Sequence, residues 1–383
     1  MNSPAISRRQ FLKTSTAAAA GLPLLSAGFS NPPFRKVGFA LCGLGSLSTQ
    51  QIAPALQQTH FCQLAGIITG TPAKAARWKA QYNLPDHGIY NYETMDRLAD
   101  NPDIDVVYVV TPNALHAEHT IKAAQAGKHV LTEKPMEVSV AKCQQMIDAC
   151  KAANRQLAVG YRLHFEPNTL ECVRLAREKV FGESRLFEGG FGFSIGDPTQ
   201  WRLNRALAGG GPLMDVGIYV LQAARFVFGE EPSLVSAVAT NTDPEKFRDV
   251  EESLAWQMKF PSGVLASCST TYRIGGMNNF KIFGTRGSFG LDSAFGYDGI
   301  HGSRSDGQEI QFPQLNQFAA EMDDFAQCVL ENRPTKVPGE EGQRDVKIMM
   351  AIYEAARSGK AVSLSLGTEA MLVESGEGEG FLA

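Results

Sequence analysis

The first half of the chain alternates short apolar runs with stretches of helical spacing. The runs have strand length and predict strands at 36–42, 62–68, 106–110, 129–132 and 156–160. Helical spacing lies between them, at 49–57, from about Pro72 onward, at 114–126 and at 139–153. Continuous apolar strands alternating with helices are typical of a parallel sheet that is covered on both faces. We therefore predict an α/β N-terminal domain with a Rossmann-type, doubly wound parallel sheet.

The second half of the chain has a different pattern, in which strand-like runs follow one another with turn residues between them. These runs lie at 184–193, 232–241, 252–260, 263–272, 278–284 and 287–292. They predict an α+β C-terminal domain built on a large, mostly antiparallel sheet. We place the first domain at 31–155 and the second at 156–383.

The N-terminus has the pattern of an export signal. Arg8 and Arg9 precede Phe11-Leu12-Lys13, and an alanine-rich run too short to span a bilayer follows. This order predicts a twin-arginine signal peptide over residues 1–30, cleaved near Ala27. We expect export of the folded protein by the twin-arginine machinery, a periplasmic or extracytoplasmic location, and no membrane anchor after cleavage.

Composition excludes several classes of function. With 44% hydrophobic and 20% charged residues the chain is globular, and a formal charge of −4 without long basic runs argues against a nucleic-acid partner. The seven cysteines include no Cys-x-x-Cys pair, and the seven histidines include no His-x-x-x-His pair. We therefore expect no metal, and cysteines that are buried free thiols.

A glycine turn follows the first predicted strand. Gly43-Leu44-Gly45 lies between strand and helix, where free backbone N–H groups can bind a phosphate. Ser48 occupies the third position of the G-x-G-x-x-G pattern, so the match is incomplete. The expected dinucleotide contacts of this turn are Gly43, Leu44, Gly45, Ser46 and Leu47.

The end of the second strand bears on which dinucleotide is bound. NAD sites carry an acidic residue there, which bonds the ribose 2′-hydroxyl. This chain has Thr69-Gly70-Thr71, followed by Lys74 and Arg77. We expect Thr69, Thr71 and Lys74 to contact a 2′-phosphate, which favours NADP over NAD. Alternatively, the two cations, Arg77 above all, solvate one helix face.

Two loops leave the carboxyl ends of later strands, the edge at which such sheets bind ligands. They are Thr111-Pro112-Asn113 and Glu133-Lys134-Pro135. Lys134 would lie beside a nicotinamide, although a lysine in that position can also be a solvated charge at a strand end. Pro135 would fix the backbone after it.

Residues 200–219 hold a second concentration of chemistry. A run of glycines, 209–211, leads into a predicted helix in which Asp215 and Tyr219 are four residues apart and share one face. The simpler interpretation is that Asp215 caps the helix and Tyr219 is a half-buried aromatic residue.

Taken together, Glu133-Lys134-Pro135 and the glycine-rich stretch before Asp215-x-x-x-Tyr219 resemble the Gfo/Idh/MocA oxidoreductase family. Most members have histidine in place of Tyr219, and tyrosine there resembles the glucose–fructose oxidoreductase branch. The resemblance runs from about residue 36 to 365. It includes the segments 160–168, 200–219, 316–326 and 338–360. It implies a large C-terminal sheet with one face at a subunit interface, and so a homodimer or homotetramer.

The resemblance also implies roles. Tyr219 would exchange a proton with a sugar hydroxyl, Lys134 would favour the phenolate and bond the reacting oxygen, and Asp215 would bind a neighbouring hydroxyl or orient Lys134. His164 and Tyr297 are the less secure substrate contacts. The residues expected around the nicotinamide half of the cofactor are Thr111, Pro112, Asn113, His116, Glu133, Lys134, Arg162, Trp201 and Arg202.

Some of these residues have simpler interpretations. His116 could be an exposed residue at a helix start, while Arg162 and His164 could be polar residues near a strand end.

The resulting hypothesis is an NADP-dependent sugar oxidoreductase, in which hydride passes between a sugar carbon and a tightly held nicotinamide. Collecting NADP before export would require a folded-protein exporter, and a retained cofactor implies ping-pong turnover with two sugars. The alternatives are a periplasmic pyranoside or glycoside dehydrogenase that forms a 3-keto sugar, and a non-catalytic nucleotide-binding sensor. After cleavage, residues 28–36 would form an N-terminal arm much shorter than that of the glucose–fructose branch.

Overall fold

A computed structural model describes residues 35–365 of the chain. The expected signal peptide at 1–30, nearly all of the short arm and the last part of the second domain lie outside these residues. From Lys36 onward the described chain belongs to one compact unit.

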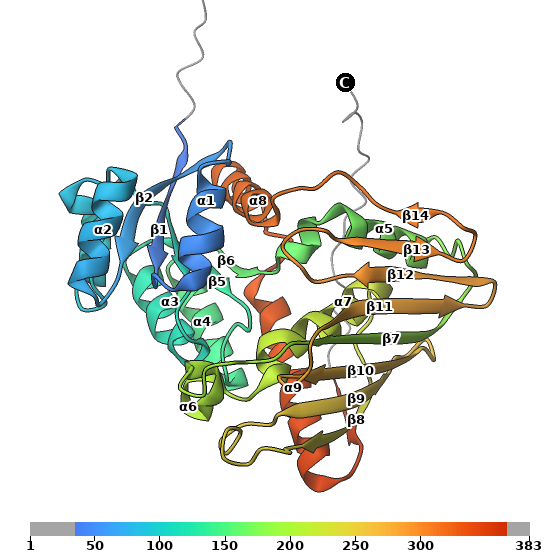
Figure 1. The fold of residues 1–383 in the computed structure, drawn as a ribbon. Helices are drawn as coiled ribbons and strands as arrows, with labels where there is room; N and C mark the ends of the chain where they lie inside the picture. Colours follow the sequence, from blue (N-terminus) through green and yellow to red (C-terminus); the bar gives the residue numbers. More distant parts are fainter. Residues whose placement is uncertain (1–34, 366–383) are drawn as a thin grey trace, which may run out of the picture. The chain divides into compact units, whose positions relative to one another are not determined.

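A six-stranded parallel sheet forms the first half of this unit, with the order β3-β2-β1-β4-β5-β6 (Figure 1). Its two central strands, β1 and β4, are buried along their length, as their continuous apolar runs predict. The sixth strand lies beyond residue 155, so the parallel sheet continues past the domain boundary that we placed at 155/156. The strands are β1 (Val37–Cys42), β2 (Cys62–Ile68), β3 (Ile89–Tyr90), β4 (Val106–Val109), β5 (His129–Glu133) and β6 (Leu157–Gly160).

Helices connect these strands in the expected order. A π-helical turn, Ser48–Ile52, continues into α1 (Ala53–Leu56), and the connections after β2, β4 and β5 hold α2 (Pro72–Tyr82), α3 (His116–Gln125) and α4 (Val140–Ala152). Pro72 begins α2 where its missing N–H leaves no bond unmade. Short 3-10 turns lie at 86–88, 95–100, 113–115, 162–165 and 201–203.

A nine-stranded sheet forms the second half, in the order β14-β13-β12-β11-β7-β10-β9-β8-β15. The sheet is mostly antiparallel, as predicted. The exception is the pair β7 and β10, which is parallel. The strands are β7 (Ser184–Gly192), β8 (Leu234–Thr240), β9 (Ser253–Lys259), β10 (Leu265–Thr271), β11 (Met277–Gly284), β12 (Gly287–Ser293), β13 (His301–Arg304), β14 (Glu309–Ile310) and β15 (Val362–Ser363).

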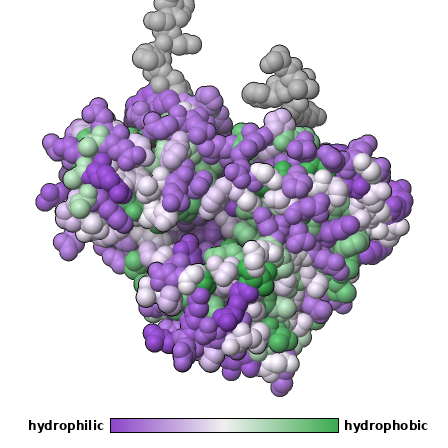
Figure 2. All heavy atoms as spheres, in the orientation of Figure 1, coloured by the Kyte–Doolittle hydropathy of each residue, from purple (hydrophilic) through white to green (hydrophobic). Residues whose placement is uncertain are grey.

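Helices cover one face of this sheet. They are α5 (Pro167–Arg177), α7 (Ile218–Phe228) and α9 (Gly339–Ser358), and they contact β12, β7 and β8 among other strands (Figure 1). A four-residue helix, α6 (Arg205–Ala208), precedes the π-helical turn Leu213–Gly217 that leads into α7. On the other face Val238 and Leu265 are 73% and 50% exposed. Figure 2 shows hydrophobic residues among the polar ones over this half of the molecule.

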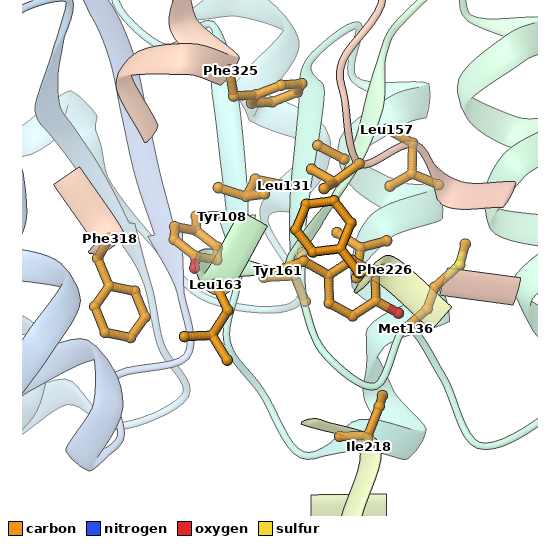
Figure 3. Close-up of a cluster of buried hydrophobic side chains, with 14 of the residues drawn as sticks. Tyr108, Leu131, Met136, Leu157, Tyr161, Leu163, Ile218, Phe226, Phe318 and Phe325 are labelled. Carbon is orange, nitrogen blue, oxygen red and sulfur yellow. The ribbon is translucent and has the colours of Figure 1, made fainter. Parts of the chain in front are cut away.

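The chain returns to the first sheet through α8 (Gln317–Glu331), which packs against α1 and β2. The carboxylate of Asp323 accepts the backbone N–H groups of His60 and Phe61 at 2.9 and 2.8 Å. Phe318 and Phe325 of this helix lie near Tyr108 and Leu131 in one buried cluster (Figure 3). The two halves of the chain therefore share a core.

All seven cysteines are buried and free, as predicted. Within residues 35–365, no helix is long and apolar enough to cross a membrane. Across the same residues, histidine, cysteine, aspartate and glutamate form no group of three or more that could hold a metal ion.

Candidate active site

The glycine turn has the backbone geometry of a phosphate cradle. Gly43 has φ +98°, and a Cβ there would lie 2.8 Å from the carbonyl oxygen of Val110, so only glycine fits. At Gly45 nothing described lies within 4 Å of the position of a Cβ, which leaves room for a ligand to approach the backbone. This turn therefore fits a dinucleotide diphosphate.

Ser48 explains the incomplete glycine pattern. Its buried hydroxyl donates to the carbonyl oxygen of Gly43 at 2.5 Å and closes the turn from within. Thr49 stabilises the turn on its more exposed side, because its N–H and its hydroxyl both donate to the carbonyl oxygen of Gly45. Leu44 is buried, Ser46 is exposed and Leu47 is half-buried.

The two cations that follow β2, Lys74 and Arg77, lie in different environments. The ammonium of Lys74 donates to the carbonyl oxygen of Leu44 at 3.1 Å, so it bridges α2 and the glycine turn. Arg77 is exposed on α2. Thr69 is buried, and its hydroxyl accepts the N–H of Thr71 at 3.3 Å. Lys74 and the two threonines thus lie beside the turn, while Arg77 fits the simpler interpretation of a solvated helix face.

Lys134 joins the two halves of the molecule. It follows β5, is linked to Pro135 by a cis peptide bond, and its side chain is 11% exposed. Its ammonium donates to the backbone carbonyl oxygen of Asp215 at 2.9 Å and lies 3.9 Å from Asp215 Oδ1. The same ammonium lies 4.7 Å from the ring centroid of Tyr219. Three residues that the sequence associates with the chemistry are therefore in contact.

The Asp215 carboxylate is held by side chains from two other segments. Its Oδ2 accepts from Arg202 Nε at 3.0 Å and from the hydroxyl of Tyr272 at 2.9 Å. Burial alone would raise the pKa of Asp215, but Arg202, Lys134 and Tyr272 together hold it below its ordinary value. Asp215 lies inside the π-helical turn and bonds these side chains, so the interpretation as a simple helix cap is wrong.

Tyr272 is a site residue that sequence reasoning missed. It follows β10, is 1% exposed, and directs its hydroxyl at Asp215. A tyrosine directly after a strand is an ordinary core residue by pattern. Its position 57 residues from Asp215 in the chain left no local signal.

Tyr219 lies in the first turn of α7 with a second cation against its ring. The guanidinium carbon of Arg162 is 4.9 Å from this ring centroid and 4.7 Å from that of Tyr297. Within residues 35–365, no group is hydrogen-bonded to the Tyr219 hydroxyl. This hydroxyl is thus available to a ligand.

Arg162 is turned toward protein rather than solvent. It is 2% exposed, and it donates to the carbonyl oxygens of Phe295 at 2.7 Å and Gly296 at 2.9 Å. It thereby fixes the loop that carries Tyr297. Burial and the neighbouring Tyr219 raise the pKa of Tyr297 above its ordinary range.

The two candidate histidines are both buried. His116 is not exposed at its helix start: its ring nitrogens lie 2.8 Å from the carbonyl oxygen of Thr111 and 3.0 Å from that of Pro135, so it ties the two ligand-edge loops together. His164 stacks on Phe226 at 3.8 Å, and burial, aided by Arg225, lowers its pKa to about 3. It lines a small cavity behind Tyr219, as a neutral aromatic side chain.

The remaining predicted contacts border the same edge. Asn113 is buried and donates to the carbonyl oxygen of Ala208 at 2.9 Å, and the half-buried Pro112 precedes it. Arg202 stacks on Trp201 at 4.7 Å. Glu133 is buried and its Oε2 accepts the N–H of Lys134 at 3.2 Å.

Comparison with known proteins agrees with this arrangement. Residues 37–161 match the model of an oxidoreductase family with an NAD-binding Rossmann fold, and residues 169–290 match the GFO/IDH/MocA C-terminal domain. An NADP(+)-dependent D-xylose 1-dehydrogenase from Haloarcula marismortui is 32% identical over 338 residues, which cover 86% of this chain and 93% of that protein.

Among solved structures, an aldose-aldose oxidoreductase from Caulobacter crescentus, complexed with glycerol, superposes with a TM-score of 0.83 and 44% identity. The match covers 86% of this chain and all (100%) of that one. KijD10, a 3-ketoreductase from Actinomadura kijaniata in complex with NADP and TDP-benzene, shares the fold, with a TM-score of 0.75 and 24% identity. The NADP(+) dependence of the D-xylose 1-dehydrogenase agrees with the preference predicted from the sequence. The chain belongs to the Gfo/Idh/MocA family of oxidoreductases, as its Glu133-Lys134-Pro135 and Asp215-x-x-x-Tyr219 motifs indicated.

Proposed function

We propose that this protein is an NADP-dependent sugar oxidoreductase whose chemistry is carried out by Lys134, Asp215 and Tyr219. The observation that carries the proposal is the contact of these three residues at the carboxyl edge of the sheet that also bears the glycine turn. The Tyr219 hydroxyl, without a partner in the described part of the chain, is the group available to a sugar hydroxyl. Relatives that act on xylose and other aldoses support sugars as the substrate class.

The cofactor, when bound, accepts or donates hydride. The backbone of Gly43 to Leu47 would hold its diphosphate, and Lys74 with Thr69 and Thr71 would hold its 2′-phosphate. Residues of the two edge loops, with Arg162, Trp201 and Arg202, would surround or support the nicotinamide half. The open space at Gly45 and the position of the Lys74 ammonium fit this group.

Tyr219 would take the proton of the reacting hydroxyl. Two cations lie against its ring, with Lys134 Nζ 4.7 Å and the guanidinium carbon of Arg162 4.9 Å from the ring centroid. The Lys134 ammonium also has hydrogen-bond capacity left for the reacting oxygen. Tyr219 thus acts as base in sugar oxidation and as acid in the reverse step.

Asp215 would have two functions in this scheme. Its backbone carbonyl, rather than its carboxylate, makes the close contact that orients Lys134. Its Oδ2 is committed to Arg202 and Tyr272, which leaves Oδ1 to accept from a neighbouring sugar hydroxyl. His164 would be a neutral packing residue that lines the same small cavity as Tyr219. Tyr297 would be a partly exposed aromatic residue, 45% exposed, whose ring lies against Arg162.

We further propose that the cofactor stays bound and turnover is ping-pong, with one aldose oxidised and a second sugar reduced. The test is to purify the protein without nucleotide, denature it and quantify the NADP(H) released. Near-stoichiometric NADP(H) supports retention, and an empty protein counts against it. Initial rates with two sugars should then give parallel lines, whereas intersecting lines would contradict the mechanism. Product analysis separates a lactone from the 3-keto sugar of the alternative glycoside dehydrogenase.

For residues 1–30 we propose a twin-arginine signal, which would let the protein leave the cytoplasm with NADP already bound. The test is a double variant, Arg8→Lys with Arg9→Lys, followed through cell fractions. The variant should stay as uncleaved precursor in the cytoplasm while the parent chain reaches the periplasm. Equal export of both chains would exclude this route.

We propose a homodimer or homotetramer built on the open face of the nine-stranded sheet. Val238 and Leu265 expose apolar surface there, 73% and 50% of each residue. Leu265→Glu should lower the mass measured by light scattering to that of a smaller species. An unchanged mass, or a monomeric parent chain, would contradict the proposal.

A further inference from the structure

A buried acidic cluster adjoins the lysine loop, Glu133-Lys134-Pro135, and includes Tyr108 and Glu321, to which the proposed reaction gives no role. The hydroxyl of Tyr108 is 2.7 Å from Glu133 Oε1 and 3.0 Å from Glu321 Oε1. The three residues are 0%, 6% and 1% exposed. They come from β4, β5 and α8, and Figure 3 shows Tyr108 among the core side chains that α8 helps to cover.

The hydrogen count of this cluster does not allow two ionised carboxylates. A phenol has one hydrogen, so Tyr108 can donate to one carboxylate and must accept at its other contact. Two ionised carboxylates would present two acceptors to a hydroxyl that has one hydrogen, and would set like charges against each other away from water. One carboxyl must therefore carry a proton.

The surroundings identify which carboxyl this is. Burial raises the pKa of Glu133 as well, but Glu133 accepts the backbone N–H of Lys134, and the charges of Lys134 and Arg162 counteract burial by favouring its ionised form. Glu321 faces Glu133 and Asp324 as well as Arg162, and its Oε2 is buried without a hydrogen-bond partner in the described part of the chain. Burial first, and then Glu133, raise the pKa of Glu321 well above its ordinary value.

We propose that Glu321 carries a proton at neutral pH and positions the lysine loop through Tyr108. The Glu321 carboxyl donates to Tyr108, the Tyr108 hydroxyl donates to Glu133, and the Glu133 carboxylate accepts the N–H of Lys134. The hydrogen bonds run in one direction and each donor has one acceptor. When Glu321 is ionised, the Tyr108 hydroxyl donates to Glu321 instead of Glu133, and the Glu133 carboxylate loses this hydrogen bond. A residue of α8 thus acts on Lys134 without touching a ligand.

The sign of the pH effect follows from this arrangement. The folded-state pKa of Glu321 lies above the ordinary value of 4.5, so its protonation stabilises the fold fully at low pH. That contribution is lost as the pH rises from this value through the folded-state pKa. Glu321→Gln imitates the protonated carboxyl, because its amide can donate to Tyr108 at every pH.

The test is the melting temperature of the purified protein and of Glu321→Gln from about pH 5 to about pH 9. The parent and the variant should have the same melting temperature at the lowest pH. Above that pH, the melting temperature of the variant should exceed that of the parent by about 2 °C more for each pH unit. Glu331→Gln, an exposed residue of the same helix that pairs with Arg333, is the matched control and should show no widening gap. A variant less stable than the parent at all these pH values would overturn the proposal.

Two further variants identify the proton carrier and the relay. Glu133→Gln should destabilise the protein, since it removes the ionised acceptor of Tyr108 and Lys134; if this variant were the tolerated one, Glu133 would carry the proton and the proposal would fail. Glu321→Gln should also remove the pH dependence that ionisation of Glu321 gives to kcat through Lys134, and Tyr108→Phe should abolish this difference between variant and parent while leaving KM for the sugar nearly unchanged. An undiminished difference would exclude the relay. The inference rests on the proposed role of Lys134, but the two can be tested separately. The melting temperatures can contradict a protonated Glu321 while the sugar assays support the reaction, and the sugar assays can contradict the reaction while the melting temperatures support a protonated Glu321.

Discussion

The glycine turn and the lysine cluster are two parts of one site, built in opposite ways. The turn is made by consecutive residues between β1 and α1, and its geometry follows from what stands at Gly43, Gly45 and Ser48. The lysine cluster consists of Lys134, Asp215, Tyr219 and Tyr272. Lys134 directly follows β5 of one sheet, Tyr272 directly follows β10 of the other, and Tyr219 lies in α7. Cofactor binding is thus locally encoded, while the proposed chemistry depends on how two sheets meet.

The largest effect should come from the centre of the lysine cluster. Tyr219→Phe removes the proposed acid/base and should lower kcat by about 10²–10⁴-fold. Its melting temperature should stay close to that of the parent, because no hydrogen bond within residues 35–365 uses this hydroxyl. Steady-state turnover with one aldose as donor and a second sugar as acceptor measures the loss. Full turnover by the variant would show that Tyr219 is not the acid/base.

A smaller effect should come from the group that holds Asp215. Tyr272→Phe removes a hydrogen bond to a buried carboxylate and should lower kcat/KM about tenfold. Asp215→Asn, which weakens both the Arg202 and the Tyr272 contacts, should cost more. Comparing the two variants with one sugar tests the contribution of Tyr272. Equal values for Tyr272→Phe and the parent would show that Arg202 alone suffices.

On the side of the glycine turn the effect should be selective rather than large. Lys74→Ala removes the cation beside the turn and should weaken NADP binding severalfold while leaving NAD binding unchanged. Arg77→Ala, the matched control on the exposed face of α2, should leave both affinities as they are. Titration of each variant with both cofactors is the measurement. Equal losses for NADP and NAD would remove Lys74 from the 2′-phosphate site.

The smallest effect concerns the closure of the turn itself. Ser48→Ala leaves the buried carbonyl oxygen of Gly43 without this donor and should lower the free energy of unfolding by about 1 kcal/mol. Chemical denaturation measures the change. Thr49→Ala, on the more exposed side of the turn, should cost less. A larger loss at Thr49 would show that the turn is held from outside.

Prediction from sequence succeeded where a property is local. The buried strands of the parallel sheet show as apolar runs, and burial on both faces leaves no other pattern for them. The strands β3, β14 and β15 were not predicted, because two residues carry no periodicity. β13 was not predicted either, because its four residues include no apolar side chain. The packing of α8 against the first sheet was also not predicted. Nothing in the sequence around Asp323 indicates that its carboxylate accepts the N–H groups of His60 and Phe61.

The same division holds within the site. Lys134, Asp215 and Tyr219 were found because each belongs to a motif, and the structure brings them into contact. Tyr272 and Glu321 belong to no motif, and tertiary packing alone gives them their positions. For His116 the alternative of an exposed residue is wrong, because a helix start gives no information about the loops that pack over it.

The central claim is that this chain transfers hydride between sugars and NADP at the lysine cluster. The most direct measurement adds one aldose to the purified protein, without added nucleotide, and follows the nicotinamide spectrum of the protein. The account predicts reduction of about one equivalent of bound cofactor, reversal on adding a second sugar, and reduction slowed by about 10²–10⁴-fold in Tyr219→Phe. No reduction with any aldose, even after NADP is supplied, would contradict it.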